Sequence, residues 1–356
     1  MNPKVSIIIL NWNGWKDTID CLESIYQINY SCYDIILVDN KSIDNSLEKI
    51  KEYCKGKIKV KSKYIKYNSL NKPIKIFEHT EEEIKSLKNR TYTYCKSSSK
   101  RIFLIKNIKN YGFAGGNNVG IRFALNTDSE YILLLNNDTI VDPDFLTEMI
   151  KTAQRYKNIG SIQSLLLKPD GKFIDSLGQE IYIWGAKDKG INSIYNPIKK
   201  DKEIFGACAA AAIYPKEVLK KIGLFDENFF VIFEDVDLSW RIRLNGFKSV
   251  LGVNSVVYHK RGISESINQC GTSDLMEYHY TKNLLITMLK YHPLSHIFGS
   301  KNLNKSIFYL KKAFFYSLKV NKTLELIKVV LISIILRISM FYHPLLYKIQ
   351  NEWIIN

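Results

Sequence analysis

VSIIILNWNG, residues 5–14, is the stretch that decides the fold, because its apolar run stops at Asn11 and a polar turn follows. The run lacks the small-residue cleavage site of a signal peptide, so residues 5–10 are predicted to form a buried strand. Helical patterns alternate with three similar runs as far as residue 165, and these predicted strands are 35–38, 102–105 and 131–135. The alternation indicates an α/β fold of βαβ units, with a mostly parallel central sheet flanked by helices.

Each predicted strand ends in a polar loop that leads into a helix. Apolar residues recur at helical spacing from Trp15 to Tyr26, Asp44 is placed to cap a second helix, and Asp142 with Pro143 suits the cap and first turn of another. In open α/β sheets, ligands bind beyond the carboxyl ends of the strands. We therefore expect four loops to gather at one edge of the sheet, namely 11–14, 39–44, 107–118 and 136–138.

Three of these loops carry residue types suited to a nucleotide diphosphate and a metal ion. Asp39, in LVDNKS, is placed to accept hydrogen bonds from a base or ribose, although an Asp that caps a turn before Ser42 fits as well. Asn136 and Asp138 follow a buried strand two residues apart, so both can face one hard cation, or form an Asx turn instead. The glycine-rich NYGFAGGNN, residues 110–118, permits close approach of backbone amides to a ligand and is not the G-x-G-x-x-G of a dinucleotide dehydrogenase.

Acidic residues and a histidine in the second half supply the remaining chemistry. FEDVDLSWRIRLNG sets Glu234, Asp235 and Asp237 at the start of a predicted helix, where the helix dipole alone would explain them. The adjoining aromatic stretch, residues 229–233, favours a functional role for these acids, because it can form a platform for an acceptor. In VYHKRG, His259 ends a predicted strand, where a neutral imidazole can bind a metal, although a lone histidine is more often structural.

In this order, the segments VSIIILNWNG, LVDNKSIDNS, NYGFAGGNN, LLLNNDTIVDP, GLFDENFFVIFEDVDLSWRIRLNG and VYHKRG resemble the bacterial family 2 glycosyltransferases of the rhamnosyltransferase-like type. The resemblance covers residues 4–291 apart from an insertion at 56–101. It implies a GT-A fold and an inverting single displacement, in which the acceptor oxygen attacks the anomeric carbon opposite the leaving nucleotide. It also implies a divalent cation, Mg²⁺ or Mn²⁺, held by Asn136-x-Asp138 where the family motif is D-x-D.

The same resemblance assigns roles to individual residues. Asp39 would bind the nucleoside, Asp138 the metal, and His259 the metal or the diphosphate. Asp235 would take the acceptor proton, with Glu234 as the second choice for the base. The predicted donor-binding residues are Asn11, Asn13, Asp39, Asn40, Ser42, Asn110, Gly115, Gly116, Asn117 and Asn137.

The chain is expected to form a catalytic domain, 1–273, and a helical C-terminal extension, 274–356. Within the first, a donor half ends near residue 170 and an acceptor half runs from 171 to 273. The lysine-rich insertion at 56–101 is expected to be irregular and solvated rather than catalytic.

The C-terminal extension carries half of the net charge of +16, because beyond residue 275 there are 11 Lys and Arg against Glu277, Glu325 and Glu352. The apolar stretch that Arg337 interrupts is shorter than the roughly 20 residues a spanning helix needs. The extension is therefore expected to lie in a membrane interface, or to pack on the enzyme or on a second copy in a homodimer.

Other function classes fit the composition less well. The six cysteines show no C-x-x-C spacing and indicate reduced thiols in the cytosol. Nucleic-acid binding lacks a recognisable motif, and the basic charge lies beside an apolar tail. The expectation is a cytoplasmic enzyme, peripheral on the inner face of the cell membrane, that builds surface polysaccharide on a lipid-linked or growing glycan acceptor. The resemblance favours dTDP-rhamnose as donor; a UDP-hexose or UDP-N-acetylhexosamine transferase and a noncatalytic membrane-associated assembly protein are the alternatives.

Overall fold

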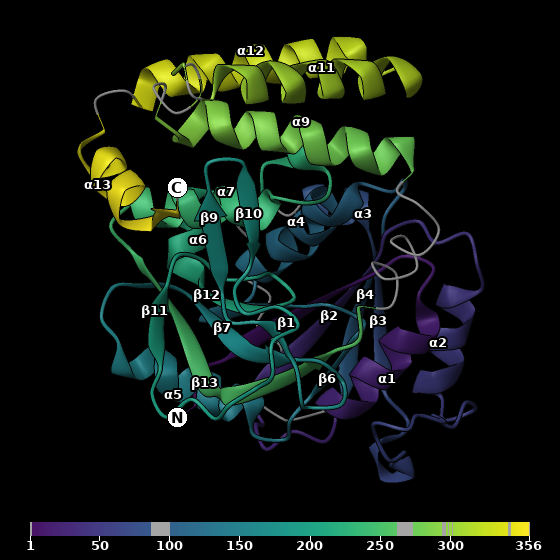
Figure 1. Ribbon diagram of the computed structural model, residues 1–356. Coiled ribbons are helices and arrows are strands. Elements are labelled where there is room, and N and C mark those ends of the chain that lie inside the picture. The colour runs from purple at the N-terminus through teal and green to yellow at the C-terminus, as the bar shows by residue number, and fades with distance from the viewer. Residues whose placement is uncertain are drawn as a thin grey trace.

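A central β-sheet forms the middle layer of the protein (Figure 1). The computed structural model describes residues 2–86, 100–261, 273–293, 297, 299–300, 302–340 and 343–355. Within these residues the strand order is β11-β13-β7-β12-β5-β1-β2-β4-β3, and two short strands, β6 and β8, pair with β13 and β7. The bounds are β1 Val5–Asn11, β2 Tyr33–Asp39, β3 Lys75–Thr80, β4 Arg101–Lys106, β5 Tyr131–Leu135, β6 Thr139–Val141, β7 Ile159–Leu167, β8 Ile174–Ser176, β11 Lys202–Ile204, β12 Ala211–Pro215 and β13 Lys248–His259.

The first half of the sheet is parallel throughout, from β3 through β4, β2 and β1 to β5. In this register Asn11 lies opposite Asp39, and Asp39 lies opposite Lys106, so the polar loops of neighbouring strands leave the sheet at one edge. β12 runs antiparallel between β5 and β7, whereas β13 is parallel to β7. The predicted α/β architecture with a mostly parallel sheet is confirmed, and the antiparallel pairs lie in its second half.

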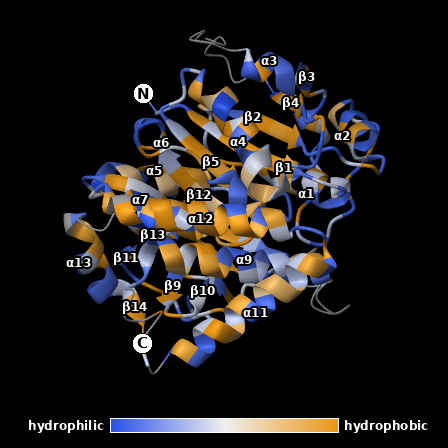
Figure 2. Cartoon of the chain, turned by 90° about the horizontal axis from the view of Figure 1, so that it is seen from above, coloured by the Kyte–Doolittle hydropathy of each residue, from blue (hydrophilic) through white to orange (hydrophobic). Residues whose placement is uncertain are grey.

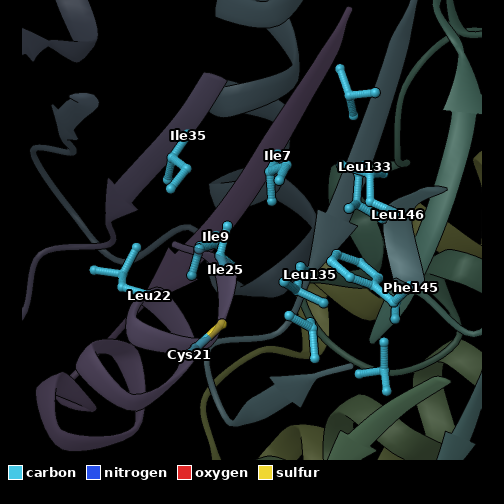
Figure 3. Packing of buried hydrophobic residues seen from close by; sticks show 14 of the residues in the cluster. Ile7, Ile9, Cys21, Leu22, Ile25, Ile35, Leu133, Leu135, Phe145 and Leu146 are labelled. Carbon is cyan, nitrogen blue, oxygen red and sulfur yellow. The ribbon is translucent and has the colours of Figure 1, made fainter. Parts of the chain in front are cut away.

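Helices cover both faces of this sheet because the strand residues alternate between them. Ile7 and Ile9 of β1 face a core with α1, α2 and α5, and Figure 3 shows Ile9 beside Ile25 of α1. Ile8 points the other way, into a core with α4, α6 and α7. The bounds are α1 Trp15–Ile25, α2 Ser46–Cys54, α4 Gly112–Leu125, α5 Phe145–Arg155, α6 Lys216–Ile222 and α7 Glu234–Leu244.

Two predicted helix caps are wrong by one or two residues. The cap of α5 is Asp144, not Asp142, because the Asp142 carboxylate accepts a hydrogen bond from the Asp144 amide in a turn before the helix. The cap of α2 is Asn45, while Asp44 accepts from the amide of Ser46, the first helical residue. In both places the acidic residue shapes the approach to the helix rather than its first turn.

The segment predicted as an irregular insertion contributes to the sheet. A 3-10 turn at Ser69–Asn71 comes before β3, and the short helix α3, Glu81–Lys85, follows it directly. β3 itself pairs in parallel with β4. Glu81 is buried and accepts a hydrogen bond from the Tyr111 hydroxyl at 2.7 Å. No strand was predicted here because KIFEHT, the sequence of β3, is short and its residues are half-buried or exposed, so its period is weak. Residues 87–99 lie outside the described residues.

The C-terminal extension consists of α9 Asp274–Tyr291, α11 Leu303–Lys319, α12 Thr323–Met340 and α13 Pro344–Trp353. Figure 1 shows α9 lying over the α/β layers, with α11 and α12 stacked on its outer side. The prediction of a wholly helical end is wrong at one place, since Ile354–Ile355 form β14 and pair with β9, Gln179–Tyr182. β9 in turn forms a hairpin with β10, Gly185–Asp188. Among the described helices, none is both long and apolar enough to cross a bilayer.

Four of the cysteines lie in the described residues, and all four are free thiols: Cys21, Cys32, Cys54 and Cys208. Burial raises the pKa of Cys21 and Cys54 to about 12, which makes these thiols unreactive. Cys95 and Cys270 lie outside the described residues.

Candidate active site

A cavity of about 280 Å³ lies where β5, β13, the β9–β10 hairpin and the start of α7 meet. Most of the second-half residues predicted to carry chemistry line it. The chemically relevant lining residues are Asn136, Asp188, Glu234, Asp235, His259 and Arg261.

The loop before α7 presents the acidic pair to this cavity, and it does so in an unusual backbone conformation. Phe230, Ile232 and Phe233 all have positive φ values, 64°, 71° and 72°. Such conformations cost roughly 1–3 kcal/mol each and persist only where neighbours hold them. Here the holding group is Asn283 of α9, whose Nδ2 lies 2.7–2.8 Å from three backbone oxygens of the loop, at Phe229, Val231 and Ile232.

The two acids at the start of α7 are in different electrostatic states. Burial, followed by the nearby Asp188 carboxylate, raises the pKa of Asp235 to about 6. Burial and the neighbouring Asp235 raise the pKa of Glu234 well above its ordinary value, and Glu234 Oε2 has no hydrogen-bond partner among the described residues. The raised pKa of Glu234 favours its uncharged form, whereas Asp235, with a pKa of about 6, is largely ionised at neutral pH and is the better candidate for the proton acceptor.

Two of the predicted metal ligands, Asn136 and His259, line another part of the cavity, and the third, Asp138, contacts His259. His259 Nε2, at the end of β13, lies 3.1 Å from Asp138 Oδ1 and 3.4 Å from Asn136 Nδ2. Its Nδ1 lies 2.8 Å from Asp175 Oδ2, which fixes the ring in the way that metal-binding histidines are commonly held. Although burial lowers the pKa of His259, the carboxylates of Asp138 and Asp175 raise it to about 9.

The Asp138 carboxylate and the His259 ring nitrogen could hold a hard divalent cation whose remaining ligands are phosphate oxygens and water, provided that the cation takes the place of the proton on His259 Nε2. In the described part of the chain, no group of three or more His, Cys, Asp or Glu side chains is arranged to hold a metal by itself. A cation here would therefore need ligands from the donor.

Three charged residues in this region were missed from the sequence. Arg261 donates to Asp175 and to Asp188, each at 2.6 Å, and so ties β8 and the β9–β10 hairpin to the end of β13. Burial opposes ionisation of Asp175, but hydrogen bonds from His259 and Arg261 lower its pKa to about 2. Arg261 lies two residues after His259 in the VYHKRG motif, so its place in the site could have been predicted. The sequence around Asp175 and Asp188 contains no motif that indicates a role for them.

The predicted nucleoside corner forms at the ends of β1 and β2. Asp39 is buried; one of its oxygens accepts from Asn11 Nδ2 at 2.9 Å and the other from the amide of Ser42 at 3.1 Å. The Ser42 hydroxyl accepts from Asn11 and from the amide of Asn13, both at 3.0 Å. These contacts match the turn-capping alternative for Asp39, and they also hold its carboxylate rigidly at the sheet edge.

The other predicted donor-binding residues make contacts within the protein. Asn40 donates to Asn110 Oδ1 at 2.9 Å and so joins two loops, and Asn117 donates to the Phe113 carbonyl inside α4. A Cβ at Gly115 or Gly116 would lie 2.8 Å from Tyr111 Cβ or 2.6 Å from Leu10 Cδ1, so packing accounts for both glycines. Their contact with a donor stays a prediction.

A chain of hydrogen bonds links the two corners. Asn137 donates to Thr18 Oγ1 at 3.0 Å, and Thr18 Oγ1 lies 2.9 Å from Asn11 Oδ1, while Asn11 binds Asp39. Because Asn137 stands between Asn136 and Asp138, the predicted metal loop and the predicted nucleoside loop share one rigid network.

Comparison with known proteins points to sugar transfer and glycan biosynthesis. The family model described as Glycosyl transferase family 2 matches residues 6–73 and 78–223. The O-antigen biosynthesis protein RfbC of Myxococcus xanthus is 26% identical over 160 residues, which are 42% of this chain and 12% of that protein. The low-salt glycan biosynthesis hexosyltransferase Agl10 of Haloferax volcanii is 25% identical over 146 residues, 38% of this chain and 44% of that protein. The matched regions thus span less than half the length of either relative.

Among solved structures, that of GalNAc-T7 with UDP, GalNAc and Mn²⁺ is similar with a TM-score of 0.57 and 14% sequence identity. The similarity covers 96% of this chain and 58% of that one. At this identity the comparison shows the fold, which is the GT-A fold.

Proposed function

Because the chain belongs to glycosyl transferase family 2, we propose that it transfers one sugar from a nucleotide diphosphate donor to an acceptor hydroxyl, with inversion at the anomeric carbon. The observation that carries the proposal is the placement of Asp235, a carboxylate with a pKa raised to about 6, in the same cavity as Asn136 and His259. A base and a phosphate-facing corner in one cavity are what a single displacement requires.

In the proposed reaction, Asp235 accepts the proton of the acceptor hydroxyl as its oxygen forms a bond to the anomeric carbon. The bond from that carbon to the donor diphosphate breaks, and the diphosphate leaves with the electron pair. Burial and Asp235 raise the pKa of Glu234 and favour its uncharged form, which avoids a second carboxylate charge beside Asp235.

Asp138 and His259 would hold a divalent cation, Mg²⁺ or Mn²⁺, with Asn136 beside them. When bound, the cation neutralises charge on the donor diphosphate. Asp175 would keep the His259 ring aimed at that corner, and Asp39 would bind the nucleoside from the ends of β1 and β2.

For the substrates we favour rhamnose from dTDP-rhamnose and a lipid-linked or growing glycan acceptor, at the inner face of the cell membrane. The motif resemblance supports the donor. The names of two relatives, which refer to O-antigen and glycan biosynthesis, support polysaccharide synthesis. The basic charge of residues 276–356 supports the membrane.

Calorimetric titration with dTDP-rhamnose and a panel of UDP-sugars, with and without manganese, tests this function. We expect binding of one donor in the presence of manganese only, followed by transfer when acceptor is added. Slow metal-dependent release of nucleotide without acceptor would exclude a noncatalytic assembly protein. Donor binding that is the same with and without manganese, together with no nucleotide release and no sugar transfer for any donor, would contradict the proposal.

Replacement of Asp138 by Ala is expected to lower donor affinity in manganese by about 100-fold, because the cation loses its protein carboxylate. Titration of the same donor measures the effect. Asp170→Ala, at an exposed acid outside the cavity, is the matched control and should bind the donor normally. Equal donor affinity of the Asp138 and Asp170 variants in manganese would show that Asp138 does not bind the metal.

A further inference from the structure

The outer side of the C-terminal extension carries a broad apolar surface. Thirteen large hydrophobic side chains on α11 and α12 are 40–84% exposed. Figure 2, which looks down on them, shows hydrophobic colour along α12 and interrupted hydrophobic colour along α11. The residues of this surface, called the helical face below, are Leu303, Ile307, Phe308, Leu310, Phe314, Phe315, Leu318, Leu324, Ile327, Leu331, Ile334, Ile335 and Ile338.

The spacing of these residues shows that they form a stripe rather than a scatter. On α12, positions 324, 327, 331, 335 and 338 recur at three or four residues, which places them on one side of the helix. The opposite sides of both helices pack inward, where Ala313 of α11 and Leu326 of α12 are buried against α9. A contiguous exposed stripe of this extent marks an interaction surface.

The charge around the stripe indicates what covers it. Between residues 303 and 340 there are seven Lys and Arg and a single acid, Glu325. Lys311 and Lys328 are exposed beside the apolar residues. Two copies of this face would bring like charges together, whereas an anionic bilayer supplies both an apolar interior and the opposite charge.

The helical face is also joined to the cavity. Trp184, at the turn of the β9–β10 hairpin, stacks on Tyr309 of α11 with ring centroids 5.6 Å apart, and Lys305 lies 5.1 Å from the Trp184 ring. The stem of the same hairpin, including Asp188, lines the cavity, as does Tyr280 of α9. The surface that would lie on the bilayer and the wall of the active site are therefore parts of one packed unit.

We infer that the helical face binds an anionic lipid bilayer and holds the mouth of the cavity at its surface, so that an acceptor anchored in the bilayer reaches Asp235 without leaving it. The part of this inference that concerns the acceptor rests on the proposed function, whereas binding to the bilayer does not depend on it. Both helices lie flat, with their apolar side chains among the acyl chains and the lysines among the headgroups.

The test compares two triple variants of the full chain that are matched in residue type. The first replaces Phe308, Leu331 and Ile335 by Ser. The second replaces three exposed residues elsewhere, Phe173, Leu70 and Ile194, by Ser. Sedimentation with vesicles of phosphatidylcholine alone, or with phosphatidylglycerol added, measures binding, and sugar transfer is measured on a lipid-linked and on a short water-soluble acceptor.

We expect the first variant to bind phosphatidylglycerol vesicles about 100-fold more weakly than the unaltered chain, and the second to bind normally. Binding of the unaltered chain should weaken with added salt and on phosphatidylcholine alone. Transfer to the lipid-linked acceptor should fall with binding, while transfer to the soluble acceptor stays unchanged.

Unchanged vesicle binding by the first variant would overturn the inference. So would a first variant that turns a dimer into a monomer while binding vesicles normally, because the helical face would then be covered by a second copy. If no form of the chain transfers sugar but the first variant still loses vesicle binding, the surface is confirmed and the proposed function fails.

Discussion

Replacement of Asp235 by Asn is expected to lower the rate of sugar transfer by about 10³-fold while leaving donor affinity unchanged. The amide keeps the size of the side chain and its contact with the Ala209 amide, but it cannot accept the acceptor's proton. Initial rates and donor titration on the same preparation measure the two quantities separately. Retained transfer in this variant would remove Asp235 as the base.

The neighbouring acid supplies the control. Glu234→Gln replaces a carboxyl whose raised pKa favours the uncharged form by an uncharged amide, so its effect on the rate should be much smaller. The pH dependence gives a third measure, because a base must be ionised to act. The rate should rise with pH through about 6, the pKa of Asp235. A large loss in Glu234→Gln with an active Asp235→Asn would reverse the two roles.

Asp237→Ala is expected to lower the free energy of unfolding by about 3–5 kcal/mol, because it leaves buried positive charges without their partner. The Asp237 carboxylate is fully buried and binds Arg241 and Lys290, both at 2.9 Å, and the Tyr291 hydroxyl at 2.7 Å. Urea unfolding at neutral pH measures the loss. Asp170→Ala, at an exposed acid, should change stability by well under 1 kcal/mol.

The pH dependence of stability follows from the same contacts. Burial opposes ionisation of Asp237, but Arg241 and Lys290 lower its pKa to about 2, below the roughly 3.9 of an unfolded Asp. Its contribution is therefore complete above about pH 4 and is lost as the pH falls toward 2. The difference in stability between the original chain and Asp237→Ala should shrink over that window. An equal difference at pH 7 and pH 3 would contradict this account.

Asp235 and Asp237 also show where sequence alone stops. Both begin the same helix, and a helix dipole or a catalytic role explains either one equally well. Two residues of helix turn the side-chain direction by about 200°, so one acid faces the cavity and the other the core. Which is which depends on Lys290 and Tyr291 of α9, whose positions no local pattern could supply.

The strands and polar loops were predictable because their signals are local. The apolar run before Asn136 ends where β5 ends, and the run before Asn11 ends one residue before the end of β1. His259 was found for the same reason, at the last residue of β13. Asp175, which orients it, lies 84 residues earlier in a three-residue strand, and only the folded sheet brings the two together.

The glycines of α4 show why a glycine-rich loop cannot be assigned to a ligand from its sequence alone. The run around Gly115 and Gly116 was interpreted as room for a ligand, yet Leu10 and Tyr111 occupy the space that a Cβ would take. A glycine permits close approach of a neighbouring group, and that group can be a substrate or another part of the protein.

The contacts of α9 bear on how enzymes with this architecture can recombine. Asn283 holds the loop before Asp235, the proposed base, and Lys290 pairs with Asp237, so the start of α7 and the first helix of the extension depend on each other. A chimaera that joined this catalytic portion to the helices of a relative would have to carry those pairs across the junction together. The outer helices α11 and α12, which carry the proposed bilayer-binding face, could be exchanged between such proteins more readily than α9.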